Sequence, residues 1–541
     1  MTHADLVVTA DAVAPSATEA QPGFGVAIRG SRVLAVGPAA GLDAVTGPDT
    51  VVEHRPGLLL PGFFDSHNHM LMTGMGMLSP NLGGCKSIAG VLDVVRAAAE
   101  HAGPGQWIVT SPAWHESSLA EQRMPTAEEL DAAGDGHPVF MRRGGHNVVL
   151  STLAFRLLDV DVTGSEPGAT IIRRADGSPT GHIVGTAYVA RLAAGLPPVP
   201  EARKRQALAH VADAYARAGI TSLVEPGLAP DDIDLFRRLG EEGVLRQRVR
   251  MMWRIAASDR DIDGAVRALG EEGGLAPFRS EWTSLFGLKL GADGGVETGF
   301  YRDAYAHPDD PAYPHGKPLL SPDALRAICT AAAATNWHVG VHCVGDAAID
   351  TVLDAFEAAD RVSSLADRRW SLIHMMYPRA DHWPRARRLA LTVTAQQPLQ
   401  FALAAGFRQY LGADRARDIE PLQAYLAEIA LPVGGGSDSP VAPYEPLVGI
   451  SSSVTRSTRA AGVVGPEWAI SVGAALQMYT SASAWCAFEE DHTGVIAPGM
   501  AADLTCLSAN ILDAPDALGD TEVTWTMAGG QVTYASEGAA R

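Results

Sequence analysis

The sequence LLLPGFFDSH, residues 58–67, begins the pattern that decides the fold: a short apolar run that ends in polar residues. Seven further short runs follow it: ITSLVEPG (220–227), RVRMMWRIA (248–256), LFGLKLGAD (285–293), HVGVHCVGD (338–346), WSLIHMMY (370–377), LTVTAQQP (391–398) and LPVGGGSDS (431–439). Most are separated by Ala-, Leu- and Arg-rich segments typical of helices, such as residues 201–219 and 323–335. This alternation predicts an α/β protein with parallel strands and crossover helices. Eight such units predict a (β/α)8 TIM barrel.

Two parts of the chain fall outside this alternation. Residues 75–200 form too long a gap for one helix and contain strand-like segments of their own, so we expect an inserted subdomain over the top of a barrel that spans residues 58–490. Residues 1–57 and 491–541 are short strands broken by Gly and Pro, which are either two unrelated appendages or one small β-sandwich. We favour the sandwich because neither end alone has enough strands for a stable sheet.

The composition argues against several functional classes. The chain of 541 residues has 42 Lys+Arg and 62 Asp+Glu, and its formal charge of −20 speaks against a nucleic-acid partner. No apolar run reaches the ~18 residues of a membrane span, and no basic segment with an apolar block marks a secretory signal. The five cysteines show neither a disulfide framework nor CxxC spacing. These features predict a cytoplasmic protein whose partner is a small molecule.

Four histidines stand where predicted strands end. His67 and His69 lie in DSHNHM, and residues at positions i and i+2 of a strand point the same way, so both imidazoles can converge on one ion. His342 and His374 end the fifth and sixth runs. Each alone is more typical of a core histidine bonded to a backbone carbonyl. Four on one barrel rim, where active sites of this fold lie, indicate a site for zinc or a similar ion.

Lys289 and Asp438 add two more polar groups at strand ends. Only four of the 42 basic residues are lysine, and Lys289 ends the fourth run. Burial would lower its pKa, and a neutral amine can add carbon dioxide to become a carbamate; an ammonium paired with Asp293 is an equal alternative. Asp438, in GGGSDSP, could take a proton from an activated water and return it to a leaving group, or could merely shape a turn.

This arrangement of HxH, Lys, His, His and Asp on successive strands resembles the amidohydrolase superfamily. The segments PGFFDSHNHM, GLKLGADGG, VHCVGDAAID, WSLIHMMY and GSDSPVAPYEPLVGI look more closely like amidohydrolase family 3, the branch that includes N-substituted formamide deformylase. The tail TGVIAPGMAADLTCLS is similar to the closing β-sandwich segment of that family. The resemblance covers essentially the whole chain, and the combined motifs are highly specific.

The resemblance implies a role for each candidate residue. It makes His67, His69, His342 and His374 metal ligands, Lys289 a carbamylated bridging ligand and Asp438 an acid/base beside the metal. It implies one or two divalent ions, zinc in particular, and a homodimer. His146, in RRGGHNVVLS, would touch the substrate or polarise its carbonyl, with a surface-loop histidine as the alternative.

The expected activity is hydrolysis of a C–N bond in a small N-acyl, formyl or cyclic amide. A lyase, isomerase or decarboxylase on the same scaffold is the alternative, because a fold does not determine a reaction. A metal-binding protein without activity is a third reading, which the full set of candidate residues disfavours. The sequence departs from the family pattern at Gly185, where relatives carry an acidic residue, and in ADGGVETGFY after Lys289.

Overall fold

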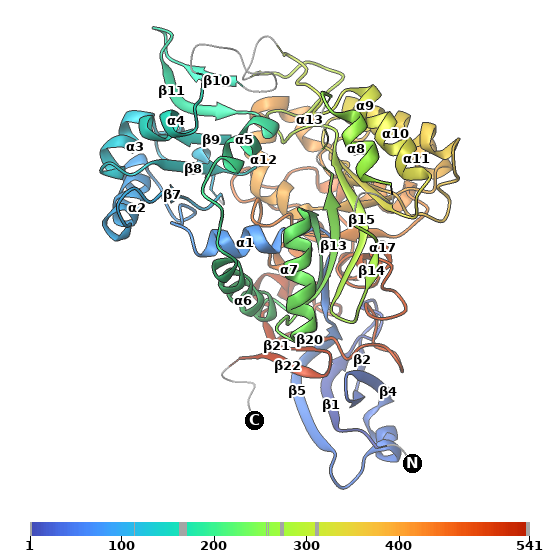
Figure 1. Ribbon diagram of the computed structural model, residues 1–541. Coiled ribbons are helices and arrows are strands. Elements are labelled where there is room, and N and C mark those ends of the chain that lie inside the picture. The colour runs from blue at the N-terminus through green and yellow to red at the C-terminus, as the bar shows by residue number, and fades with distance from the viewer. Residues whose placement is uncertain are drawn as a thin grey trace.

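The computed structural model describes residues 3–536, except residues 113, 146, 162–169, 256, 258, 271–274 and 309–312. Figure 1 shows a broad upper part and a narrower lower part. The upper part holds the barrel and, beside it, the segment predicted as an insertion, whereas the lower part carries both chain ends. Among the helices that the structure describes, none combines the length and apolar character needed to cross a bilayer.

Parallel strands form the barrel. Within the described residues there are eight: β6 (Phe63–Asp65), β12 (Ile220–Leu228), β13 (Arg248–Arg254), β15 (Thr283–Gly291), β16 (His338–Cys343), β17 (Ser371–His374), β18 (Thr392–Ala395) and β19 (Val433–Gly435). Each pairs in parallel with the next, while the short β14 (Phe278–Arg279) pairs antiparallel with β15. Ser66 N donates to Gly435 O at 2.9 Å, which joins the first strand to the last. Each of the eight apolar runs contributes one strand to the barrel, so the predicted parallel α/β barrel is confirmed.

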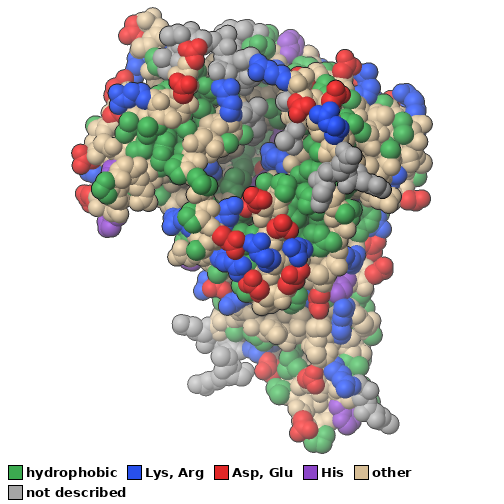
Figure 2. Space-filling view, in the orientation of Figure 1, with side chains coloured by type: hydrophobic (Ala, Val, Ile, Leu, Met, Phe, Trp, Pro, Cys, Tyr) green, Lys and Arg blue, Asp and Glu red, His purple; other side chains and the backbone are tan. Residues whose placement is uncertain are grey.

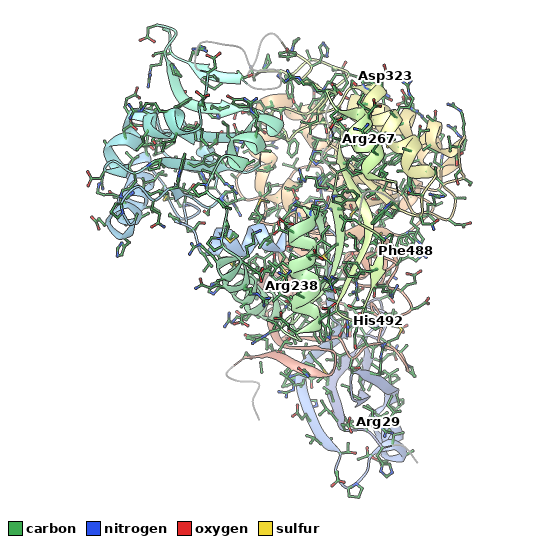
Figure 3. The ribbon with its side chains drawn as sticks, viewed as in Figure 1. Arg29, Arg238, Arg267, Asp323, Phe488 and His492 are labelled. Atoms are coloured by element: carbon green, nitrogen blue, oxygen red, sulfur yellow. The ribbon has the colours of Figure 1, made fainter. Side chains whose placement is uncertain are left out.

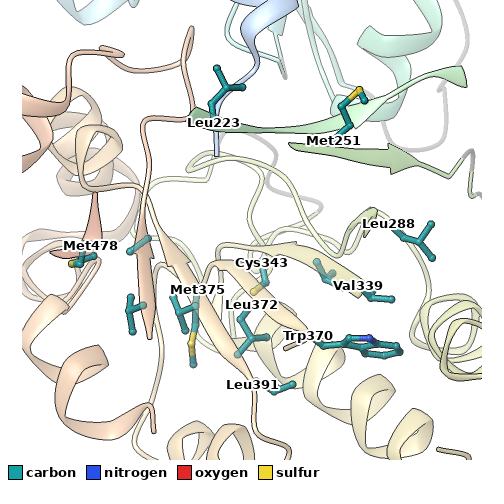
Figure 4. Close-up of a cluster of buried hydrophobic side chains, with 14 of the residues drawn as sticks. Leu223, Met251, Leu288, Val339, Cys343, Trp370, Leu372, Met375, Leu391 and Met478 are labelled. Atoms are coloured by element: carbon teal, nitrogen blue, oxygen red, sulfur yellow. The ribbon is translucent and has the colours of Figure 1, made fainter. Parts of the chain in front are cut away.

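Helices follow the strands along the chain. They are α6 (Glu201–Arg217), α7 (Pro230–Glu241), α8 (Ile262–Ala268), α9 (Pro322–Ala333), α10 (Asp346–Asp360), α11 (His382–Arg388), α12 (Gln397–Leu411), α13 (Ala413–Arg417), α14 (Leu422–Glu428), α15 (Pro446–Thr455), α16 (Val472–Met478) and α17 (Ser481–Cys486). Several of them, such as α6, α7 and α10, pack against the barrel strands. Figure 4 shows part of the buried apolar layer, in which Val339 and Cys343 of β16 lie close to Leu372 of β17. Cys343 is fully buried in this layer, where it packs as a small apolar residue.

The inserted subdomain, between β6 and β12, has a sheet of its own. Its helices are α1 (Met70–Met77), α2 (Ile88–His101), α3 (Ala127–Gly134), α4 (Thr152–Leu157) and α5 (Thr186–Ala194), and its described strands are β7 (Ile108–Val109), β8 (Val139–Arg143), β9 (Asn147–Leu150), β10 (Thr170–Arg173) and β11 (Pro179–Val184). The sheet order is β10-β11-β9-β8-β7. Figure 2 shows that the molecular surface is hollowed between this subdomain and the barrel. The exact limits of residues 75–200 stay a prediction.

Both chain ends share one sheet, which we call the terminal sheet. It comprises β1 (Leu6–Val13), β2 (Gln21–Pro22), β3 (Phe24–Arg29), β4 (Arg32–Pro38), β5 (Val51–Pro61), β20 (Leu504–Leu507), β21 (Val523–Ala528) and β22 (Gln531–Ala535). In the described part of the chain it is one continuous ladder, and its arrangement as a sandwich stays a prediction. Residues 58–61 pair with β20, so the run at residues 58–67 supplies both the terminal sheet and β6.

A buried ion pair ties the barrel to the terminal sheet. Arg248 on β13 donates from Nε to Asp503 at 2.8 Å, and both side chains are fully buried. Asp503 also accepts the backbone N–H of Gly529 at 2.7 Å. Figure 3 labels Phe488 and His492 in this junction, where His492 lies 3.1 Å from a guanidinium nitrogen of Arg32. The junction is therefore charged and hydrogen-bonded as well as apolar.

Candidate metal centre

The C-terminal edge of the barrel brings the four predicted histidines together. The ring centroid of His67 lies 5.3 Å from that of His69 and 4.9 Å from that of His374. The rings of His374 and His342 are 4.6 Å apart. His67 and His374 are buried, and His69 and His342 are partly exposed. The imidazoles thus form one group that faces the barrel mouth, as the strand-end positions predict.

Strand alternation aims these side chains. Leu288 and Leu290 of β15 pack in the apolar layer under the helices, so Lys289 between them points into the barrel. The same alternation turns His342 of β16 inward. His374 has a positive φ of 68°, which bends the chain at the end of β17. Without that bend His374 would point to the same side as Leu372, so the left-handed backbone serves the site.

Asp438 lies against the first two histidines. Its Oδ1 is 3.1 Å from Nε2 of His67 and 3.2 Å from Nε2 of His69, and its backbone N–H donates to the carbonyl of His67 at 2.8 Å. Ligand atoms of these three residues lie within 4.8 Å of one another. Burial alone would raise the pKa of Asp438, but the hydrogen bonds from His67 and His69 hold it well below its usual range.

Lys289 is a buried amine. Its Nζ has no hydrogen-bond partner among the described residues, and burial lowers its pKa to about 7 although Asp438 opposes this. Asp293, the alternative partner, instead accepts the backbone N–H groups of Phe300, Val344 and Gly345, each at 2.9 Å. The described contacts include no ion pair between Lys289 and Asp293. A sizeable fraction of Lys289 is therefore neutral at physiological pH.

The donor set fits a divalent cation. Burial lowers the pKa of His67 to about 3, with a further contribution from Lys289, and burial also lowers the pKa of His374 far below its usual range. Both imidazoles are therefore neutral, which is the form that binds metals. Nδ1 of His374 is buried and, like Nζ of Lys289, has no partner in the described part of the structure. Neutral imidazoles beside one carboxylate are ligands typical of zinc.

Two carboxylates that the sequence analysis did not select support the site. Asp65, at the end of β6, accepts the backbone N–H groups of His67 at 3.1 Å and Ser437 at 3.0 Å. Glu225, on β12, lies 3.8 Å from Nδ1 of His69, and burial raises its pKa to about 8. Both are acidic residues near the end of a predicted strand, the same signal that identified Asp438. That signal would have found them had it been applied to every run.

His146 lies outside the described residues, so its predicted role stays a prediction. Nearby in the sequence, Arg143 donates to Glu297 and Glu116, both at 2.9 Å, and Asn147 donates to Glu297 at 2.5 Å. Glu297 belongs to the stretch ADGGVETGFY, which departs from the family pattern. This buried polar cluster joins the inserted subdomain to the loop that follows β15, beside the barrel mouth.

A second group of potential ligands is already neutralised. Asp350, Asp381 and His382 also place ligand atoms within 4.8 Å of one another. Arg302 donates from Nη2 to Asp350 at 2.6 Å and to Asp381 at 2.7 Å. The guanidinium occupies the position that a cation would take, so this group is an ion-pair cluster.

Comparison with known proteins agrees with this geometry. Residues 55–534 match the model of the amidohydrolase family. The chain is 26% identical to the protein LONG AFTER FAR-RED 3 of Arabidopsis thaliana, over 98% of this chain and 92% of that protein. It is 25% identical to N-substituted formamide deformylase of Arthrobacter pascens, over 95% of each. An uncharacterized metal-dependent hydrolase from Pyrococcus furiosus has a similar fold, with a TM-score of 0.71 at 23% identity over 94% of this chain and 99% of the other.

Proposed function

Because the chain belongs to the amidohydrolase family, we propose that it is a metal-dependent hydrolase that cleaves a C–N bond in a small, non-peptide amide. The observation that carries this proposal is the meeting of four histidines with Asp438 on one barrel rim. N-acyl, N-formyl and cyclic amides are the candidate substrates. The formal charge of −20 supports a small-molecule partner over nucleic acid, and a homodimer is part of the proposal only through the family resemblance.

The residues of the candidate metal centre would hold the ion. His67, His69, His342 and His374 supply neutral nitrogens, and Asp438 supplies a carboxylate. A divalent ion there, zinc in particular and as one ion or two, supplies Lewis acidity that activates water and polarises a carbonyl. The neutral amine of Lys289 can add carbon dioxide and release one proton, which leaves an anionic carbamate oxygen as a further ligand.

Asp438 moves the proton in this proposal. It is ionised at neutral pH because its pKa lies far below the usual range, so a carboxylate oxygen can accept the proton of the attacking water. Asp438 then delivers that proton to the amide nitrogen as the C–N bond breaks. The products are a carboxylic acid and a free amine. Asp65 holds the loops of His67 and Ser437 together and thereby keeps Asp438 in reach.

The experiment is a metal analysis of the purified protein followed by a screen of N-formyl and N-acyl amines in 18O-labelled water. We expect an acid product that carries the label and an equimolar amine, with turnover lost in Asp438→Asn. Products without solvent oxygen would contradict hydrolysis and point to lyase, isomerase or decarboxylase chemistry. Full turnover by Asp438→Asn would remove this residue from the mechanism.

A further inference from the structure

A cavity of about 340 Å³ lies beside the candidate metal centre. The hydroxyl groups of Ser439 and Thr73 line the cavity on the side of the candidate metal centre. Ser439 directly follows Asp438, Thr73 lies one helical turn after His69, and their side-chain oxygens are 3.0 Å apart. The volume is enough for about ten water molecules, which places it in the range of small-ligand sites. The cavity therefore begins one residue away from the proposed acid/base.

The lining of the cavity has more apolar than polar surface, and most of its polar groups are uncharged. Three segments form its described walls: Ser111, Pro112, Trp114, His115 and Ser118 of the inserted subdomain, Ala402, Leu403, Ala405 and Gly406 of α12, and residues 439–445 after β19. Burial lowers the pKa of His115, so this imidazole is neutral. Among the described lining residues only Glu445 and Arg459 carry a full charge; Glu445 is partly exposed and Arg459 is exposed. A charged ligand group would lose its hydration here without a buried counter-ion, whereas an apolar group would gain from burial.

The position of the cavity selects one end of the substrate. Asp438 delivers its proton to the amide nitrogen, so that nitrogen lies near Asp438 when the bond breaks. The wall formed by residues 439–445 continues directly from Asp438. We propose that this cavity binds the substituent on the amide nitrogen and that the preferred substrates are amides of bulky, uncharged, apolar amines. This inference rests on the proposed function and adds the substrate class.

Gly406 controls how much of the cavity is free. It lies on α12 in the cavity wall, and a Cβ added there would meet only Val296 Cγ1, at an ordinary contact distance of 3.7 Å. A Cβ at this lining position therefore displaces no backbone, a leucine side chain there would reduce the free room, and leucine favours the helix more than glycine does. Gln409, exposed on the same helix, provides a matched control outside the cavity.

The test uses a ladder of N-alkylformamides from methyl to hexyl with the wild-type holoenzyme, Gly406→Leu, Gly406→Ala and Gln409→Leu. For the wild type we expect kcat/KM to rise about fourfold for each added methylene until the cavity is full. Gly406→Leu should lower kcat/KM for the hexyl compound at least tenfold and leave the methyl compound unchanged. Gly406→Ala should lie between, and Gln409→Leu should match the wild type. A flat wild-type ladder, or an equal loss for methyl and hexyl, would overturn the inference.

Calorimetric binding of the same ladder to the same four proteins separates the two proposals. If no amide is turned over but affinity rises with chain length and falls in Gly406→Leu, the proposed function fails while the apolar site stands. If amides are hydrolysed but the binding affinity does not change with the length of the N-alkyl chain, the cavity assignment fails and the proposed function stands. Melting temperatures and metal content confirm that each variant is folded and loaded.

Discussion

His338 makes the barrel sensitive to acid at the end opposite the candidate metal centre. It begins β16, is buried, and lies against Phe286 and Phe488 with ring-centroid distances of 5.3 and 5.9 Å. Its Nε2 is 3.3 Å from the hydroxyl of Ser371. Burial lowers the pKa of His338 to about 4, and the nearby charge of Arg369 contributes in the same direction. The folded protein therefore keeps this imidazole neutral at pH values where the unfolded chain protonates it.

The effect on stability has a definite sign and size. Between pH 6.5 and 4 the unfolded chain binds one more proton at His338 than the folded protein, so the free energy of unfolding falls as the pH falls. At about 1.4 kcal/mol for each pH unit, the loss from this group is about 3 kcal/mol. For a chain of this length that corresponds to a fall in Tm of about 3 °C. Above pH 6.5 the group has no further effect.

The assay is the Tm of wild type and His338→Phe from pH 7.5 to 4. Phenylalanine keeps the aromatic contacts and has no titrating nitrogen, so the variant should lose less stability below pH 6.5. The difference in Tm between the two proteins should shift by about 3 °C across this range. A constant offset could follow from the lost bond to Ser371, but a difference that does not change with pH would refute the reasoning. His210→Phe, at an exposed position on α6, should follow the wild-type profile.

Three further predictions address the centre and the junction. Asp438→Asn should lower kcat by at least about 100-fold per metal-loaded site, because it removes the proposed proton carrier; steady-state kinetics with metal analysis would check this. When the free metal concentration is 1,000 times its Kd, removal of the metal should lower the Tm by about 4 °C, and added zinc should restore it. The Tm of His67→Ala should not change on removal or addition of metal. Arg248→Met should destabilise the protein by about 3–5 kcal/mol because it leaves Asp503 buried without its partner. The double variant with Asp503→Leu should recover most of that loss in a thermal melt, and an equal loss in both would contradict the assignment.

The barrel and its rim were predictable because they depend on local patterns. A parallel strand covered on both faces is a continuous apolar run, and eight such runs stood out between helical segments. A polar residue at the C-terminal end of such a run lies at the edge of the barrel, so its side chain is expected at the barrel mouth. His67, Lys289 and Asp438 were selected in this way, and the structure brings them together with the other three strand-end histidines, His69, His342 and His374.

Other features depend on contacts that the sequence does not show. The run at residues 58–67 serves two sheets, but both sheets bury it, so no change in polarity marks the division. Gly62 stands at that division, where a Cβ would meet Thr221 Oγ1 at 2.3 Å. Asp65 and Glu225 stand near strand ends, as Asp438 does, but their contacts with His67 and His69 appear only in the folded chain. The sequence shows Gly406 only as a glycine within a helix, and its position in the cavity wall is known only from the folded structure.

The closure of the barrel has a consequence for biosynthesis. Asp65 and Ser437, which hold the two sides of the seam together, are 372 residues apart in the chain. A ribosome must therefore release most of the polypeptide before His67 can meet Asp438. Until His67 and Asp438 meet, the nascent chain lacks the complete candidate metal centre. A metal ion can therefore bind to the full set of ligands only when translation has almost ended.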